Sequence, residues 1–226
     1  MDRKTYNQYY FLVEGECEER YLRWLQNLIN QEPDRIANVS FTIKRNIRMV
    51  SWVKHLPLMG KTQIVQVVDY EGNQPNDRQT FLNMLNDIHR ASQIKQVDCQ
   101  LGYSNLTFEL WILLHKIDYR VPLNTKAQYL EQLNRAFHKN FETLKKYKQE
   151  KNFQSVLQTI TLDDVKKAIS RAEKIRKYNE QNFHKEVYKR KYIYFKDNPD
   201  CSLQEVVKAV LIESGIMRKD KSESNY

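Results

Sequence analysis

The stretch FLVEGECEERYLRWL, residues 11–25, decides how the first part of the chain folds. An apolar run of strand length comes first and ends at Gly15, and apolar residues then recur at helical spacing. Two carboxylates, Glu14 and Glu18, stand at this junction. They are either solvated acids of an ordinary strand-to-helix turn or part of a metal site.

The same alternation of strand and helix patterns continues as far as residue 123. A polar loop marked by Gly72, Pro75 and Asn76 follows the third strand, and Ser104–Asn105 are expected to cap the fourth helix. The alternation predicts an α/β fold with a mostly parallel sheet flanked by helices. The expected strands are residues 9–15, 38–44, 63–68 and 96–105, and the expected helices are residues 16–30, 51–59, 78–92 and 106–117.

From residue 124 onward the sequence shows helical patterns only. The pairs Thr161–Asp164 and Ser202–Glu205 have the capping-box spacing that opens a helix. The chain therefore divides into an α/β domain, residues 1–123, and a basic helical region, residues 124–226. We expect this region to pack on the α/β domain or to extend from it.

Composition restricts the class of protein. The chain has 226 residues, of which 41% are hydrophobic, as in one globular domain with or without an extension. Its polar N-terminus lacks a signal-peptide core and no run approaches the roughly 20 apolar residues of a membrane span, so we expect a cytoplasmic protein. The cysteines, Cys17, Cys99 and Cys201, have neither a disulfide nor a zinc spacing and are expected to be partly buried thiols.

The net charge of +9 is concentrated in one segment. Residues 139–196 carry 16 basic and 7 acidic residues, whereas the rest of the chain carries 21 of each sign. A basic segment on a neutral body is typical of a surface that binds phosphates, but a solvated helical extension has the same composition.

Acidic residues gather where strands are expected to end. Glu14 ends the first strand, Asp69 and Glu71 end the third, and Glu109 begins the helix after the fourth, while Glu18 lies one turn beyond Glu14. The carboxyl ends of parallel strands meet at one edge of a sheet. Several carboxylates at that edge would repel one another without a cation, and Mg²⁺ prefers oxygen ligands.

Glu109 is the acid that is hardest to explain as a surface residue. Its neighbours are apolar on nearly all sides, so we expect it to be buried. A buried carboxylate needs a metal ion, a Lys or Arg, a hydrogen-bond donor or a proton. ATP binding is excluded, because LMGKT, residues 58–62, lacks the earlier glycine of a phosphate-binding loop.

Three segments, residues 11–22, 67–72 and 104–115, resemble in order and spacing the RloB-like proteins of bacterial phage-defence and restriction loci. The resemblance extends over nearly the whole chain, and FELWILLH, residues 108–115, is its most specific block. Those proteins carry a Toprim domain related to the nuclease domain of the OLD family. The resemblance therefore implies a nuclease that uses Mg²⁺ or Mn²⁺.

The Toprim pattern has a catalytic glutamate after the first strand and an Asp-x-Asp pair after the third. Glu14 matches the glutamate, Glu18 matches the second glutamate of OLD-type nucleases, and Asp69 matches the first aspartate. Glu71 departs from the pattern, because it replaces the second aspartate with a side chain one methylene longer. The resemblance implies that Glu14, Asp69 and Glu71 are catalytic and that these three, with Glu18 and Glu109, are metal ligands.

The resemblance also implies site-lining residues and partners. Ser104 and Asn105 match polar positions of the family's SNxxFELW block, which would face the site. His115, at the end of the same block, is a further site-lining candidate or a packing residue. RloB-like proteins usually accompany an ABC-type ATPase encoded nearby, which would sense infection and control the nuclease.

The leading hypothesis is a metal-dependent nuclease that cleaves DNA or RNA, tRNA included, during abortive infection. The rival is a non-catalytic subunit that binds nucleic acid or an ATPase and whose acids are structural. The sequence leaves the oligomeric state open, with a homodimer as one option. The residues expected to hold nucleic acid are Lys145, Lys146, Lys148, Lys166, Arg171, Arg176, Lys189, Arg190 and Lys191.

Overall fold

A five-stranded sheet forms the centre of the computed structural model, which describes residues 5–57, 62–95 and 97–218. The strand order is β2-β1-β3-β4-β7, with the first four strands parallel and β7 antiparallel to β4. This confirms the predicted α/β fold with a mostly parallel sheet. The strands are β1 (Thr5–Val13), β2 (Ala37–Arg45), β3 (Thr62–Tyr70), β4 (Val97–Asn105) and β7 (Asp200–Cys201).

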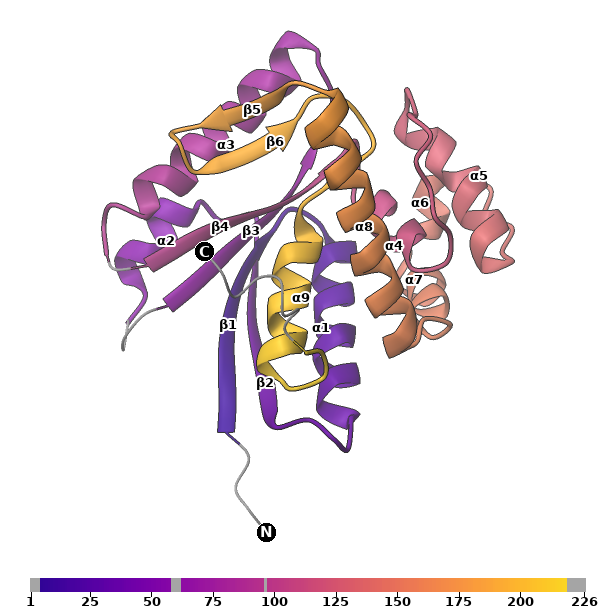
Figure 1. The fold of residues 1–226 in the computed structure, drawn as a ribbon, viewed down its shortest axis with the longest axis horizontal. Coiled ribbons are helices and arrows are strands. Elements are labelled where there is room, and N and C mark those ends of the chain that lie inside the picture. The colour runs from indigo at the N-terminus through magenta and orange to yellow at the C-terminus, as the bar shows by residue number, and fades with distance from the viewer. Residues whose placement is uncertain (1–4, 58–61, 96, 219–226) are drawn as a thin grey trace.

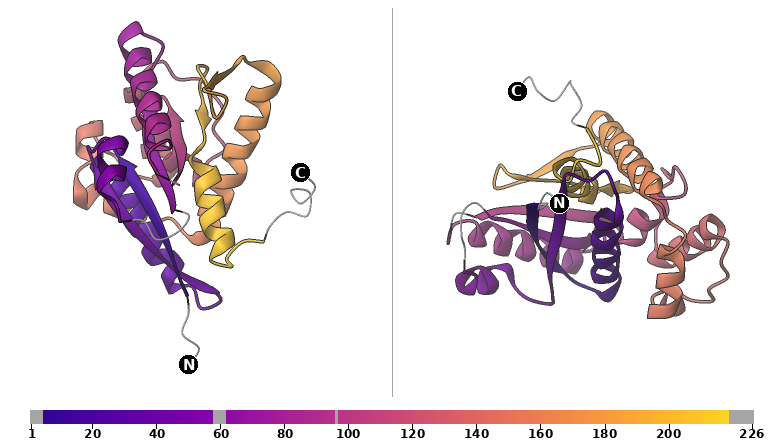
Figure 2. Two further views of the ribbon diagram at one scale, coloured as in Figure 1. Left: turned by 90° about the vertical axis from the view of Figure 1, so that its left-hand side faces the viewer. Right: turned by 90° about the horizontal axis from the view of Figure 1, so that it is seen from below.

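Helices cover both faces of the sheet (Figures 1 and 2). One face carries α1 (Glu16–Gln31), α4 (Glu109–Leu114), α8 (Leu162–Asn182) and α9 (Leu203–Glu213). The other carries α2 (Met49–His55), α3 (Pro75–Ala91) and a hairpin of β5 (Lys185–Tyr188) and β6 (Tyr192–Phe195). The short helices α5 (Lys126–Phe137), α6 (Leu144–Tyr147) and α7 (Glu150–Leu157) lie at one side of the molecule (Figure 1).

The alternation of side chains in the strands builds two apolar cores. In β1, Phe11 and Val13 pack on the face of α1, whereas Leu12 packs on the face of α2 and α3. The core on the α1 face contains residues from both parts of the chain that the sequence analysis separated at residue 123, including Trp111 of α4 and Ile169 of α8. The helical region therefore packs on the α/β part instead of extending away from it.

The C-terminal half contains short strands that the sequence analysis did not expect. Tyr192 and Tyr194 of β6 are buried against the α3 face, and β7 continues the main sheet beside Ser104 and Asn105. These strands are only two to four residues long. Such short segments show little periodicity, and they are stabilised by tertiary packing that a local pattern does not reveal.

Two helix boundaries also differ from the prediction. Pro75 and Asn76 were assigned to a loop but form the first turn of α3. Proline is tolerated at the first position of a helix, because the amide that it lacks would have no partner within the helix. Ser104 and Asn105 do not cap α4, because they are the last residues of β4. The helix that was expected over residues 106–117 is limited to Glu109–Leu114. Residues 58–61, which include most of LMGKT, lie outside the described residues.

The two predicted capping boxes have different outcomes. Thr161 accepts a hydrogen bond from the Asp164 amide and Asp164 accepts one from the Thr161 amide, so the first box is confirmed. Ser202 makes no side-chain cap of α9. Its hydroxyl instead donates to the Leu101 carbonyl and accepts from the Tyr103 amide, which ties the start of α9 to β4. No helix within the described residues is long and apolar enough to span a membrane.

Side chains of α1 occupy the outer edge of the sheet. The Asn30 side chain accepts from the Val39 amide at 2.8 Å and donates to the Val39 carbonyl at 2.9 Å, and Gln26 accepts from the Phe41 amide at 2.6 Å. These backbone groups of β2 would otherwise be free to pair with another strand. The two amide side chains therefore block this edge.

Replacing Asn30 with alanine is expected to lower the free energy of unfolding by about 1–2 kcal/mol. The substitution leaves both backbone groups of Val39 without their partner, and an unsatisfied, part-buried polar group is costly. Urea denaturation would measure the change, with the exposed neighbour Gln31→Ala as the matched control. A change in Asn30→Ala no larger than that in the control would contradict this role.

Candidate metal centre at the carboxyl ends of the strands

Four of the predicted acids meet in one cleft. The carboxyl ends of β1 and β3 and the start of α1 surround a space of about 390 Å³. Two lysines from the C-terminal half, one at the start of α5 and one just after α6, also reach it. The lining residues are Glu14, Gly15, Glu16, Cys17, Glu18, Asp69, Glu71, Lys126 and Lys148.

Glu14 links the ends of two neighbouring strands. One of its carboxylate oxygens accepts a hydrogen bond from the Asp69 amide, with an N···O distance of 3.3 Å. Burial of the carboxylate raises the pKa of Glu14, and the negative charge of Glu71 raises it further, while the Asp69 amide and Lys126 act in the opposite direction. Glu14 is thus a carboxyl group at the cleft mouth that holds a proton more readily than usual.

Glu18 folds back over the start of α1, and Gly15 makes this possible. A Cβ atom at Gly15 would lie 2.6 Å from Glu18 Oε2, so any other residue would displace the carboxylate. Burial is the largest cause of the raised pKa of Glu18, and the charges of Glu109 and Glu14 add to it. A glycine is therefore needed between the two glutamates, because a side chain there would occupy the space of the Glu18 carboxylate.

Asp69 is the acid of the cleft whose charged form is most disfavoured by its surroundings. Burial raises the pKa of Asp69 well above its ordinary value, and the nearby charges of Glu109 and Glu18 raise it further. Lys126 only partly offsets this, with its Nζ 3.4 Å from Asp69 Oδ2 and 2.6 Å from Glu71 Oε1. One ammonium group therefore bridges the Asp-x-Glu pair at the end of β3.

Glu109 is fully buried, as the sequence predicted. The Thr107 hydroxyl donates to its Oε2, and Lys148 Nζ lies 3.0 Å from its Oε1. That Oε1 accepts no hydrogen bond from any described residue, so its negative charge is balanced by the ion pair with Lys148. Of the alternatives that the sequence left open, the structure supplies a lysine and a hydroxyl donor.

The cleft contains more negative than positive charge. Glu14, Glu18, Asp69 and Glu71 of the cleft and the adjacent Glu109 act on one another, and the ammonium groups of Lys126 and Lys148 oppose them. Glu16, which also lines the cleft, pairs with Arg20 and Arg45. All the donor atoms are hard carboxylate oxygens, the type that Mg²⁺ and Mn²⁺ prefer. In the described part of the chain, no three His, Cys, Asp or Glu side chains already stand in a metal-binding arrangement. The donor set fits a divalent cation, while the lysines hold the carboxylates in the geometry seen here.

Two buried tyrosines border this cluster, a position that the sequence did not predict for either. Tyr129 of α5 and Tyr147 of α6 have buried hydroxyls without a hydrogen-bond partner among the described residues. Burial raises the pKa of both, and the charge of Glu109 adds to each shift. Their sequence patterns resemble ordinary core aromatics, so only the three-dimensional structure reveals their proximity to the acids.

The predicted site-lining residues do not line the cleft. Ser104 lies beside Asp69 in the sheet, but it is buried and its Oγ lies 3.6 Å from Cys201 Sγ. The Asn105 side chain donates to the carbonyl groups of the chain after β6, at 3.0 Å from the Phe195 oxygen. β7 and the chain before it cover the end of β4, so neither residue is among those that line the cleft.

His115 is a packing residue and not part of the cleft. Its Nδ1 lies 2.9 Å from the Trp111 carbonyl oxygen, which can only accept, so Nδ1 carries the proton and Nε2 accepts from the Tyr21 hydroxyl at 3.2 Å. Burial lowers the pKa of His115 from 6.5 to about 4. His115 is therefore not among the residues that line the acid cleft.

The neutral state of His115 predicts a pH-dependent contribution to stability. Because the folded pKa lies below the unfolded one, this contribution is complete above pH 6.5 and is lost as the pH falls towards 4. Relative to His115→Gln, the wild type should lose about 3 kcal/mol over that window. Urea unfolding at several pH values, with exposed His184→Gln as control, would test this. Parallel pH profiles of the wild type and His115→Gln would contradict it.

The predicted nucleic-acid-binding residues do not form one surface. Lys145 and Lys146 are exposed on α6 next to Lys148, which the structure places in the acid cleft. The tip of the β5–β6 hairpin, residues 189–191, is exposed elsewhere, since Lys191 pairs with Asp98 at the start of β4. Six strand residues separate Asp98 from the end of β4, which is roughly 20 Å.

Two arginines of α8 have structural partners instead of free guanidinium groups. Arg176 is largely buried and its Nη1 lies 2.6 Å from the buried carboxylate of Asp200, so it is not available to a phosphate. Arg171 donates to the Leu114 carbonyl at 2.6 Å. Lys166, on the same helix, is partly exposed. Of the predicted cationic residues, Lys148 lines the acid cleft, and Lys145 and Lys146 lie on α6 just before it.

Comparison with known protein families identifies one match that covers most of the chain. The family model described as RloB-like protein matches residues 9–210, which begin in β1 and end in α9 and include every acid of the cleft. No curated protein and no solved structure matches the chain. Because the family model covers most of the sequence, the chain belongs to the RloB-like protein family.

Proposed function

We propose that this protein is a Mg²⁺- or Mn²⁺-dependent nuclease of the Toprim type, related to the nuclease domains of OLD-family proteins. Its substrate is DNA or RNA, tRNA included. It acts in the cytoplasm as the effector of an abortive-infection response under the control of an ABC-type ATPase. The observation that carries this proposal is the unbalanced acid cluster, in which burial and like charge raise the pKa of Asp69 well above its ordinary value.

Each acid has a distinct place in the proposed chemistry. Asp69, Glu18 and Glu109 are the most buried and would hold the metal, and Glu71, at the rim, would complete the ligand set. A bound divalent ion would polarise the phosphodiester and make a bound water more acidic. Glu14, with its raised pKa at the cleft mouth, is suited to hold and deliver a proton.

The lysines and the neighbouring basic residues would act on the substrate. If a bound metal ion balanced the negative charge of the carboxylates, the ammonium groups of Lys126 and Lys148 would be free to contact a phosphate. Lys145 and Lys146 lie beside them on an exposed turn and would extend the contact along the backbone. This supports a phosphodiester as the substrate more than it supports a neutral molecule.

One observation favours the non-catalytic alternative. Lys126 and Lys148 already pair with Asp69, Glu71 and Glu109, so the acids have cationic partners without a metal. In that case the cleft is a structural ion-pair cluster, and the exposed lysines bind nucleic acid or an ATPase without cleavage. Burial is the first cause of the raised pKa values of Asp69 and Glu18, and repulsion from Glu109 adds to both, a repulsion that a bound cation would relieve.

A cleavage assay separates the two functions. The purified protein would be incubated with plasmid DNA and total tRNA in the presence of Mg²⁺, Mn²⁺ or EDTA, alone and with the ATPase and phage extract. The proposal predicts cleavage with either metal and none with EDTA. Absence of cleavage under every condition, including the complete system, would overturn the proposal and favour a binding subunit.

A further inference from the structure

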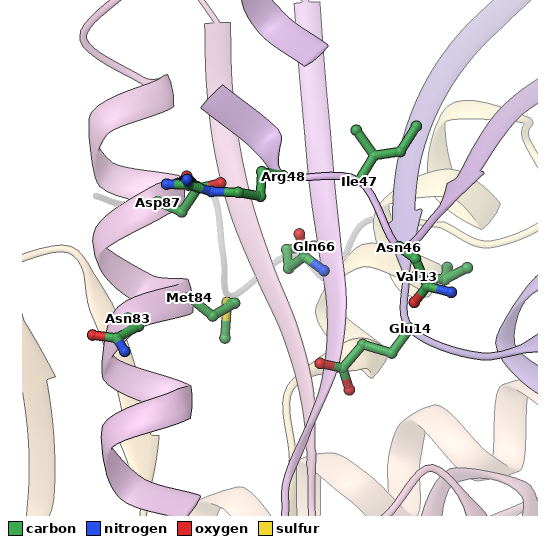
Figure 3. Close-up of a pocket in the computed structure, with 9 residues that line it drawn as sticks. All are labelled: Val13, Glu14, Asn46, Ile47, Arg48, Gln66, Asn83, Met84 and Asp87. Carbon is green, nitrogen blue, oxygen red and sulfur yellow. Dashed lines mark hydrogen bonds and ion pairs between the residues drawn. The ribbon is translucent and has the colours of Figure 1, made fainter. Parts of the chain in front are cut away.

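A second groove adjoins the acid cleft and shares Glu14 with it. It has a volume of about 530 Å³ and lies between the end of β1, the middle of β3, the segment before α2, and α3 (Figure 3). In Figure 3, Glu14 extends into this space from the end of β1, and Met84 projects towards Gln66 from α3. The lining residues are Val13, Glu14, Asn46, Ile47, Arg48, Gln66, Asn83, Met84 and Asp87.

The charges in this groove are unsuitable for a phosphate. Asp87 accepts two hydrogen bonds from Arg48, at 3.2 and 2.9 Å, through a single oxygen, and its other oxygen accepts from the Val50 amide. Glu14 adds a second carboxylate, so the lining acids outnumber the one guanidinium. A neutral ligand avoids the repulsion that an anion would meet here.

The remaining groups match an unpaired nucleobase. The Arg48 side chain is 70% exposed, and Asp87 holds its guanidinium in place. One planar face of the guanidinium is therefore available for stacking. Asn46 provides an amide group that both donates and accepts, as the edges of bases require. Gln66 offers its amide oxygen, since its Nε2 already donates to the Leu12 and Val67 carbonyl oxygens at 3.5 Å. Ile47 and Met84 supply apolar surface for a ring. Bases of unpaired strands are recognised by this combination of stacking and amide contacts.

We propose that this groove receives an unpaired nucleobase next to the phosphodiester in the acid cleft, so that the protein acts on single-stranded nucleic acid. The inference rests on the proposed nuclease function for its link to cleavage, but the binding of a base is a separate property. A paired base cannot enter a groove that is walled by the sheet and α3 without leaving its partner.

The first test is binding without turnover. Fluorescence anisotropy in EDTA would follow a labelled ten-nucleotide single strand of RNA or DNA and the duplex of the same sequence. Wild type should bind the single strands at least about tenfold more tightly than the duplex. Arg48→Lys, which keeps the charge beside Asp87 but loses the planar group, should reduce single-strand binding about tenfold and leave duplex binding unchanged.

Two further variants guard against indirect effects. Asn46 has a positive φ of 52°, which glycine adopts without strain, so Asn46→Gly removes the amide and preserves the backbone. It should also weaken single-strand binding, with an unchanged melting temperature. Arg23→Lys is the matched control, because Arg23 is an exposed arginine paired with Glu19 outside the groove.

The outcomes distinguish this inference from the proposed function. If the wild type cleaves but Arg48→Lys and Asn46→Gly bind and cleave single strands like the wild type, the groove inference is wrong and the nuclease stands. Equal binding of duplex and single strand by the wild type also overturns it. If no metal supports cleavage but both variants lose single-strand binding, the base-binding groove stands and the nuclease proposal fails.

Discussion

Asp69→Asn should abolish metal-dependent cleavage and at the same time make the protein more stable. The loss of a ligand should reduce activity by more than about 100-fold, since even the residues that orient metal ligands commonly contribute 10–100-fold. The gain in stability follows from the raised pKa of Asp69, which shows that its charged form is disfavoured in the folded state despite Lys126. Asparagine has nearly the same shape and no charge.

The direction of this pKa shift determines how the stability difference between Asp69→Asn and the wild type changes with pH. A carboxyl group with a raised folded pKa favours folding most below its unfolded pKa of about 3.9, and this advantage is lost as the pH rises. The difference in unfolding free energy between Asp69→Asn and wild type should therefore be near zero below pH 4. It should grow to about 1–3 kcal/mol in favour of the variant at pH 8.

Urea denaturation at both pH values and the cleavage assay would test the two halves together. The exposed residue Asp34 lies outside the cleft, so Asp34→Asn controls for the loss of one negative charge. If Asp69→Asn retained full activity, Asp69 would not be a metal ligand. A variant less stable than wild type at pH 8 would show instead that the pair with Lys126 outweighs the repulsion among the acids.

Lys148→Met should destabilise the metal-free protein by about 3 kcal/mol and restore its stability when Mg²⁺ or Mn²⁺ is added. The substitution leaves the fully buried Glu109 with the Thr107 hydroxyl as its remaining partner. Breaking a buried ion pair costs about 3–5 kcal/mol, and the lower value applies because the Lys148 side chain is 44% exposed. A divalent ion would replace the missing positive charge.

A double-mutant cycle with Glu109→Gln identifies the cause. If Lys148 acts on stability through Glu109, the double variant Lys148→Met/Glu109→Gln should recover most of the loss. Lys145→Met, three residues earlier on the exposed side of α6, is the matched control. A loss in Lys148→Met that neither metal nor Glu109→Gln reverses would mean that the lysine stem acts by packing alone.

The sequence predicted the parts of the fold that depend on local patterns. Apolar alternation and helical spacing are sufficient for β1 to β4 and for helices such as α1 and α8, because each buries one face against the sheet. The strands β5 to β7 were missed, since their short length leaves no periodic signal. In β6, Tyr194 is buried against Phe81 and Tyr103, which are distant in sequence.

The candidate site was also predicted only in part. Glu14, Glu18, Asp69 and Glu71 were expected at one edge because strand ends in a parallel sheet converge, and the structure brings them into one cleft. Lys126 has no comparable signal, because it approaches the cleft only through the packing of α5. Arg176 was predicted to bind nucleic acid, but it pairs with Asp200 of β7, a strand that no pattern indicated.

Manganese binding tests the central claim most directly. Electron paramagnetic resonance would count the Mn²⁺ ions bound by the wild type, by Asp69→Asn and Glu109→Gln, and by the control Asp34→Asn. The account predicts saturable binding that is retained in Asp34→Asn and lost in both cleft variants. Equal manganese binding by the wild type and Asp69→Asn, or none by the wild type, would contradict a metal centre at this edge of the sheet.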